Sequence, residues 1–179
     1  MKTIRHILPL TALLLWGIAT GARAQGIALH TDVAAWGMKV MNAGADFVLT
    51  ETSSVDVTLY QSMGDTWLKD TRVTAAQVAY RYWLSHQPLE SLYVGVTATP
   101  AVYKSRIGGS SHDGECVVGG IGLGYCWPLS HRWNVQAAVG VGVTYLSEAV
   151  TRPDGTRWQR YKLAFTPADA ELRVSYIIK

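Results

Sequence analysis

The sequence predicts an all-β protein: an eight-stranded antiparallel up-and-down transmembrane β-barrel, preceded by a cleavable signal peptide. Between Trp133 and Tyr145, every odd position is apolar and every even position is small or polar. A strand with this pattern has one apolar and one polar face. A similar alternation, starting at Ala168, runs to Ile178. The number of strand candidates is even, as in bacterial single-chain outer-membrane barrels.

The run from Trp133 to Tyr145 also has the length of a membrane crossing. Its twelve steps of roughly 3.3 Å, on a strand tilted by about 40°, separate the two aromatic ends by about 30 Å along the barrel axis. That distance is close to the height of an outer-membrane apolar band with its aromatic girdles. The run is therefore predicted to span a membrane.

The first 24 residues are typical of a secretory signal peptide. Lys2 and Arg5 precede an apolar stretch from Ile7 to about Ala19, and Ala22-Arg23-Ala24 offers a cleavage site. The apolar stretch is shorter than the roughly 20 residues that a spanning helix needs. We expect a signal peptide at 1–24 and a barrel domain at 25–179, exported to the cell outer membrane. Without a helix-length apolar run, the exported domain can cross a membrane only as a closed barrel.

Charge and cysteine content exclude some functions. Of the 16 basic residues, Lys2, Arg5 and Arg23 belong to the signal peptide, so the rest balance the 13 acidic residues. This balance gives no support to a nucleic-acid partner. Cys116 and Cys126 lie ten residues apart in one predicted strand and are too distant there to bridge each other. We expect them to be free thiols or to have an intermolecular role.

Turn signals divide the exported region into eight strands. The predicted ranges are about 26–36, 44–51, 55–62, 72–84, 91–103, 116–128, 133–146 and 167–178. Connections are tight near 53–54, 86–89 and 130–131, and longer at 63–71, 104–115 and 147–166; the first, at 37–43, is intermediate. Short periplasmic turns and longer outer loops alternate in this way in outer-membrane barrels.

Residue parity assigns the side chains of each strand to a face. In the fifth strand Leu92, Val94 and Val96 form the more apolar face, but this register leaves Tyr93 and Tyr103 pointing inward, so it stays open. The lipid-facing side chains of the other strands, besides the two runs above, are predicted to be Ile27, Leu29, Val33, Ala35, Ala45, Phe47, Leu49, Val55, Val57, Leu59, Ala76, Val78, Tyr80, Tyr82, Val117, Ile121, Leu123, Tyr125 and Trp127.

Aromatic residues gather at strand ends, where amphipathic rings favour the membrane interface. The alternative is that aromatic residues simply prefer strands. The predicted interfacial aromatics are Tyr80, Tyr82, Trp83, Tyr93, Tyr125, Trp127, Trp133 and Tyr176 beside short turns or the C-terminus, and Tyr145 at the other end.

The opposite parity places polar and charged residues of both signs inside the barrel. An eight-stranded barrel is only wide enough for side chains, so we expect a paired, hydrogen-bonded plug. A proton or ion path is the alternative, because acids outnumber bases. The predicted interior residues are His30, Asp32, Asp46, Asp56, Tyr60, Gln77, Arg81, Asn134, Gln136, Asp169, Glu171 and Arg173.

The chain resembles a family of small Bacteroidetes outer-membrane proteins known as domain of unknown function 3575. The resemblance covers nearly the whole exported region. The matching segments are IALHTD at 27–32, YRYWL at 80–84, GIGLGYCWPLSHRWNVQAAVGVGVTY at 120–145, and Phe165-Thr166-Pro167 with the closing strand. The resemblance implies a barrel fold. It also implies a surface-assembly role, because genes of this family often accompany genes for fimbrial proteins. A cysteine-bearing loop common in the family has no counterpart at 147–159.

The side chains that could bind a metal or take part in catalysis do not form a convincing site. His30 with Asp32, or His112 with Asp113 and Glu115, could supply metal ligands, but nothing fixes a geometry. Ser110, Ser111, His112 and Asp113 have the types of a hydrolase site, yet neighbours in one loop rarely form a preorganised one. The spacing of Gly120, Gly122 and Gly124 does not fit a dinucleotide fingerprint. We expect no cofactor, metal or catalysis.

The predicted function is that of an integral outer-membrane barrel with a structural or surface-assembly role, linked through the resemblance to fimbriae. Its expected partners are outer-membrane lipid, lipopolysaccharide or cell-surface fimbrial proteins, with loop contacts at Arg152, Arg157 and Trp158. Two alternatives stay open: a soluble periplasmic barrel that binds a small apolar ligand, and a narrow pore.

Overall fold

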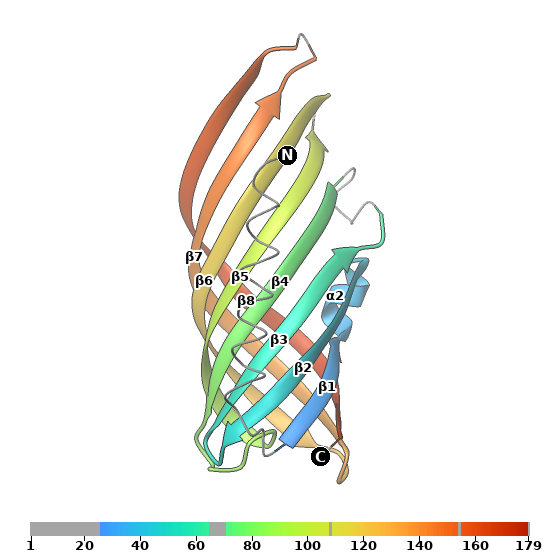
Figure 1. Cartoon of the computed structure of the whole chain (residues 1–179), viewed down its shortest axis with the longest axis vertical. Coiled ribbons are helices and arrows are strands. Elements are labelled where there is room, and N and C mark those ends of the chain that lie inside the picture. The colour runs from blue at the N-terminus through green and yellow to red at the C-terminus, as the bar shows by residue number, and fades with distance from the viewer. Residues whose placement is uncertain (1–25, 65–70, 108, 154, 179) are drawn as a thin grey trace.

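The computed structural model describes residues 26–64, 71–107, 109–153 and 155–178, and the predicted signal peptide lies outside them. Within these residues, eight antiparallel strands form a closed barrel in which each strand pairs with its sequence neighbours and β8 pairs with β1 (Figure 1). The predicted all-β fold of eight antiparallel up-and-down strands is therefore confirmed. The elements are β1 (Gly26–Asp32), α2 (Val33–Gly37), β2 (Val40–Thr50), β3 (Ser53–Ser62), β4 (Thr71–Trp83), β5 (Ser91–Ile107), β6 (Ser110–Pro128), β7 (Trp133–Thr151) and β8 (Arg157–Ile177).

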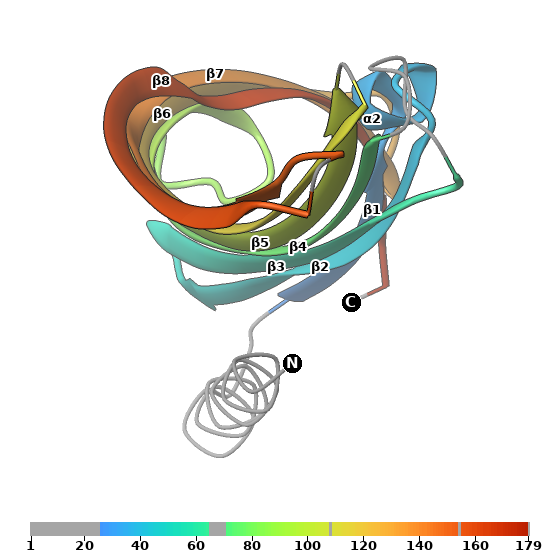
Figure 2. The same cartoon turned by 90° about the horizontal axis from the view of Figure 1, so that it is seen from above.

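The strand register explains the tilt and width of the barrel. The line of paired residues that leaves β8 at Ile177 passes through all the other strands and returns to β8 at Thr166, eleven residues away. Such a stagger tilts the strands against the barrel axis and sets the diameter. Figure 2 shows the ring from above. Eight strands leave room for side chains but not for a wide channel.

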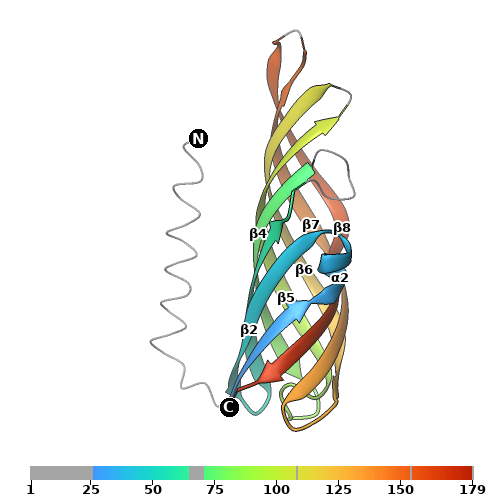
Figure 3. The same cartoon turned by 90° about the vertical axis from the view of Figure 1, so that its right-hand side faces the viewer.

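The two ends of the barrel differ. The C-terminus lies at the end that carries the short turns after β2, β4 and β6, which we call the turn end (Figure 1). At the opposite end, the hairpin end, β5 to β8 extend far beyond β1 (Figure 3). The connections predicted at 104–115 and 147–166 are wrong, because β5 pairs with β6 up to Ile107 and Ser110, and β7 with β8 up to Thr151 and Arg157.

The predicted first strand, 26–36, is also wrong beyond Asp32. The Asp32 side chain caps α2 by accepting a hydrogen bond from the Ala34 amide at 3.0 Å. The same Oδ1 atom accepts one from the Leu172 amide of β8 at 3.1 Å. A side chain thus takes the place of a backbone partner at the end of β1, and aspartate is a favoured N-cap. Val33 and Ala35 consequently lie in a helix instead of on the outward face of a strand.

β8 contains a bulge that changes the predicted facing of one residue. The pairing with β7 shifts between Gly140 and Val141, which pair with Asp169 and Pro167, so Ala168 is the extra residue. A side chain at Gly142 would meet the Cβ of Ala168, which shows that Ala168 points inward and not toward lipid as predicted.

Apolar side chains cover the outside of the barrel. Phe165 is 76% exposed, Ile121 65% and Val139 61%. In β5, Val94 and Val96 are exposed while Tyr93 is buried, so the more apolar face of this strand points outward. None of the predicted outward side chains of β2 to β7 is buried.

An apolar layer closes the interior at the turn end. Trp83 and Tyr93, predicted at the interface, instead point inward and stack with ring centroids 4.7 Å apart. Leu89, from the turn between β4 and β5, packs in the same layer. The Cys126 thiol donates a hydrogen bond to the Leu89 carbonyl at 2.7 Å, and Trp83 Nε1 donates one to Ser54. Indole N–H groups usually find such a partner when buried, which accounts for the inward position of Trp83.

Among the residues that the structure describes, no helix has both the length and the apolar character needed to cross a membrane.

Candidate functional site

A cluster of charged side chains fills the barrel interior beyond the apolar layer. Its members come from five strands and are each at most 7% exposed: His30, Asp46, Asp56, Arg81, Glu171 and Arg173. Buried charges are stable only when they are paired and hydrogen-bonded. The geometry of their pairing therefore decides what this site can do.

Strand register brings the two aspartates together, and two arginines compensate them. Asp46 and Asp56 are direct cross-strand partners on β2 and β3, with both side chains inside. Arg81 Nη1 lies 2.6 Å from Asp46 Oδ1, and its Nη2 lies 3.5 Å from Asp56 Oδ1. Arg173 Nη1 lies 2.9 Å from Asp56 Oδ2, and its Nη2 donates to Glu171 Oε1. Each arginine thus bridges two carboxylates.

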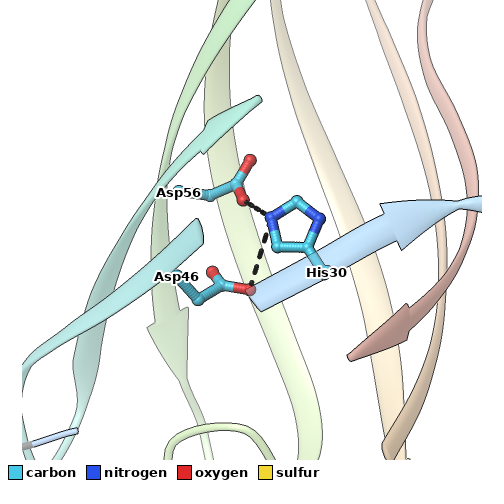
Figure 4. A group of neighbouring side chains, drawn as sticks. All are labelled: His30, Asp46 and Asp56. Atoms are coloured by element: carbon cyan, nitrogen blue, oxygen red, sulfur yellow. Dashed lines mark hydrogen bonds and ion pairs between the residues drawn. The ribbon is translucent and has the colours of Figure 1, made fainter. Parts of the chain in front are cut away.

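His30 lies beside both aspartates. Its Nε2 is hydrogen-bonded to Asp56 Oδ2 and lies 3.9 Å from Asp46 Oδ2 (Figure 4). Glycine at position 44 makes room for the ring, because a Cβ there would overlap the imidazole and Thr58.

The cluster fits a salt-bridge network better than a metal centre. The nearest ligand atoms of His30, Asp46 and Asp56 lie within 4.8 Å of one another, a spacing that could hold an ion. However, both carboxylates are already paired with the guanidinium groups of Arg81 and Arg173, which would repel a divalent cation. The predicted pair of His30 with Asp32 does not form a site either, because Asp32 is engaged with α2 and Leu172.

The other predicted interior residues surround this cluster. Tyr60 donates a hydrogen bond to Gln77 Oε1 at 2.8 Å, and Gln136 Oε1 accepts one from Arg81 at 3.4 Å. Asn134 is buried nearer the turn end, where its amide donates to the Leu89 carbonyl. Asp169 lies against Gly140 on the inner face of β8.

Several interior residues are absent from the predicted interior set, and Tyr93, one of them, contacts the charged cluster. The Tyr93 ring lies 5.1 Å from the guanidinium carbon of Arg81, a cation–π geometry that joins the charged cluster to the apolar layer. The space left between Arg81, Tyr93 and Asp169 is about 10 Å³, enough for roughly one water molecule. The interior is thus packed as a plug at this level.

A second polar cluster lies toward the hairpin end, beyond the level of Tyr145. Tyr103 Oη donates a hydrogen bond to Glu148 Oε2 at 2.9 Å, and His112 Nδ1 lies 3.4 Å from the same atom. Burial, and then the Glu148 carboxylate, raise the pKa of Tyr103 above its usual value. Gly114 leaves room for the tyrosine ring.

This arrangement separates the residues predicted to share a loop site. His112 faces inward to Glu148, whereas Asp113 is exposed on the opposite face of β6. Strand alternation therefore keeps His112 apart from Asp113 and Glu115, and it breaks up the set of Ser110, Ser111, His112 and Asp113.

The remaining predicted residues lie on the surface. Arg152 stacks over the Trp158 ring at 4.8 Å in the β7–β8 hairpin, where Arg157 is also exposed. At the turn end, Trp133 contacts Tyr176 with ring centroids 5.1 Å apart. The other predicted interfacial aromatics are exposed on the outer surface: Tyr80, Tyr82, Tyr125, Trp127 and Tyr145.

Comparison with known proteins places this architecture in a family. Neither the curated proteins nor the solved structures contain a match to the chain. The family model described as "Protein of unknown function (DUF3575)" matches residues 10–178, which is nearly the whole sequence. The chain therefore belongs to the DUF3575 family.

Proposed function

We propose that this protein is an integral barrel of the bacterial outer membrane, exported by residues 1–24, with a structural or surface-assembly role and no catalytic activity. The observation that carries the proposal is the distribution of side chains, which is the reverse of that in a soluble protein: apolar side chains face outward and charged side chains face inward. Phe165, Ile121 and Val139 are more than half exposed, whereas Arg81 and Arg173 are almost completely buried. Contiguous apolar surface of this extent is rare on soluble monomers, but hydrocarbon favours it.

The packed, charged interior supports this proposal over its two rivals. A soluble barrel that holds a small apolar ligand needs an apolar cavity. Here the interior is filled by the Asp46–Arg81 and Asp56–Arg173 ion pairs. A narrow pore needs a continuous aqueous path, whereas the space beside Arg81 and Tyr93 is about 10 Å³.

The hairpin end supports a role in assembly at the cell surface. β7 and β8 stay paired well beyond Tyr145, up to Thr151 and Arg157, as a ribbon that carries exposed polar side chains. In an outer-membrane barrel the end opposite the short turns faces outward. A paired ribbon is a more rigid contact surface than a loop. The family resemblance makes a fimbrial protein the partner to test first.

Membrane insertion and orientation can be tested together in cells. In a background with Cys116 and Cys126 replaced by alanine, single cysteines at Gln159 and His131 mark the hairpin and turn ends. We expect the protein to fractionate with outer membranes and to change electrophoretic mobility on boiling. A membrane-impermeant maleimide should label the Gln159→Cys variant in intact cells and the His131→Cys variant only after permeabilisation. Recovery in the aqueous periplasm would contradict the proposal.

The assembly role needs a separate test. A strain that lacks the protein is complemented with the full chain or with a variant in which a short turn replaces residues 149–159. We expect both proteins to fold in the membrane but only the full chain to restore the number of fimbriae seen by electron microscopy. An unchanged number in the deleted strain would argue against the fimbrial link.

A further inference from the structure

Two grooves that differ in chemistry cross the outward face of the barrel, one over β4 to β7 and the other over β3 to β8. The groove nearer the turn end has a volume of about 700 Å³ and an almost wholly apolar lining, with Tyr80, Val96, Ile121 and Val139 among its residues. The groove nearer the hairpin end has a volume of about 500 Å³. Charged side chains from neighbouring strands line it: Arg72, Lys104, Asp113, Glu115 and Arg157.

Each groove follows a line of cross-strand partners. The apolar groove follows Gly95, Gly122 and Gly140, which pair in this order across β5, β6 and β7. A Cβ at Gly122 would lie 2.9 Å from the Val139 carbonyl oxygen, so only glycine permits this close packing of the wall. The charged groove follows another such line, the backbone of Tyr103, Gly114 and Glu148, where the Tyr103 and Glu148 side chains lie on the inner face. The hollows are therefore built by the register and do not depend on mobile loops.

The separation of the grooves matches the depth of one lipid leaflet. Gly95 and Tyr103 are eight residues apart on β5, which corresponds to about 26 Å along the strand and, at a tilt of about 40°, to about 20 Å along the membrane normal. A bilayer of about 40–45 Å, headgroups included, has leaflets of roughly 20 Å. An amphiphile in the outer leaflet can therefore reach both grooves.

The side chains of the charged groove indicate which lipid headgroup it fits. Arg72 and Lys104 are direct cross-strand partners with exposed side chains, as phosphate binding requires. Lys104 is also opposite Asp113, and Glu115 lies two residues further along β6. Carboxylates repel a bare phosphate but accept hydrogen bonds from hydroxyl groups. A sugar that carries phosphate can contact both kinds of side chain, whereas a phospholipid without headgroup hydroxyls can contact only the cations.

We propose that the two grooves together bind one molecule of a phosphorylated, acylated glycolipid of the outer leaflet, the chemistry of lipid A. An acyl chain lies in the apolar groove along Ile121 and Val139, the phosphate lies between Arg72 and Lys104, and sugar hydroxyls face Asp113 and Glu115. This inference rests on the proposed membrane location and adds a specific ligand to it. The Arg152–Trp158 pair of the hairpin tip is not required.

Native mass spectrometry of the full-length barrel, extracted in detergent and titrated with purified diphosphoryl lipid A, tests the inference. We expect one lipid A per barrel. The double variant Arg72→Glu/Lys104→Glu should weaken retention at least tenfold, and Ile121→Trp, which fills the apolar groove without adding polarity, should weaken it independently. A charge-matched control, Lys39→Glu/Lys162→Glu, alters cations that do not line the grooves and should retain lipid A like the unmodified protein.

Boiling-dependent mobility shows for each variant that the barrel is folded. If the unmodified protein and the Arg72→Glu/Lys104→Glu variant retain lipid A equally, the inference is overturned. It is also overturned if the unmodified protein retains dephosphorylated lipid A or dipalmitoyl phosphatidic acid as well as it retains lipid A. A barrel that folds in membranes but fails these tests refutes only the lipid site. A protein recovered in the aqueous periplasm refutes the proposed function itself.

Discussion

Replacement of Val139 by arginine should destabilise the barrel strongly if its outer face contacts hydrocarbon. Val139 is 61% exposed and lies six residues from both Trp133 and Tyr145. Six steps of about 3.3 Å at a tilt of about 40° put it about 15 Å from either aromatic girdle, at the bilayer midplane. Arginine at this depth costs about 2–4 kcal/mol in outer-membrane barrels. At an equally exposed position in water, the change would stay within about 0.5 kcal/mol.

Reversible urea unfolding in lipid vesicles measures this difference. The matched control is Ser147→Arg on the same face of β7, two residues beyond Tyr145, where the cost should be about 0–1 kcal/mol. The gap between the variants should be about 2 kcal/mol, or roughly 30-fold in the unfolding equilibrium. If Val139→Arg is no more destabilising than Ser147→Arg, hydrocarbon does not surround the middle of β7 and the assignment of faces is wrong.

The packed interior leads to three further predictions. Arg173→Met removes the nearer guanidinium partner of two buried carboxylates and should lower the free energy of unfolding by about 3–5 kcal/mol in the same assay; an unchanged value would mean that the cluster is not buried. Gly142→Ala should prevent folding, judged by boiling-dependent mobility, because a Cβ there meets the Gly119 carbonyl, whereas Gly119→Ala, which meets nothing, should fold normally. Cys126, fully buried, should react with maleimide only after unfolding, while the half-buried Cys116 should react sooner; equal rates would contradict the packing of the turn end.

The strands could be predicted wherever one face is apolar. Between Trp133 and Tyr145 the surroundings differ on the two sides of the sheet, so the sequence alternates and reveals the strand. Beyond Tyr145 the two faces no longer alternate in the sequence: exposed polar residues follow one another around the hairpin tip, the buried Val150 stands next to Ala149, and residues 147–166 resemble a loop. For this reason the ends of β5 to β8 could not be located from sequence.

Other differences between the prediction and the structure depend on contacts between strands that are far apart in sequence. β1 ends at Asp32 because the Asp32 side chain accepts a hydrogen bond from the Leu172 amide of β8. No local sequence pattern reveals this partner. The interior charges could be assigned from parity, but the pairing of Arg81 with Asp46 follows from register across β2 to β4. The more apolar face of the fifth strand already implies an inward Tyr93, but the sequence leaves that register open because it does not show the Arg81 and Trp83 side chains that the ring contacts.

The most direct test of the central claim is a spin-label accessibility scan along residues 134–144 of β7 in lipid vesicles. We expect odd positions such as Val139 to be accessible to oxygen and protected from a water-soluble nickel complex, with even positions such as Ala138 protected from both, because their side chains are inside the plug. High accessibility of the odd positions to the nickel complex would mean that water, and not hydrocarbon, covers the apolar face. The proposed membrane location would then be wrong.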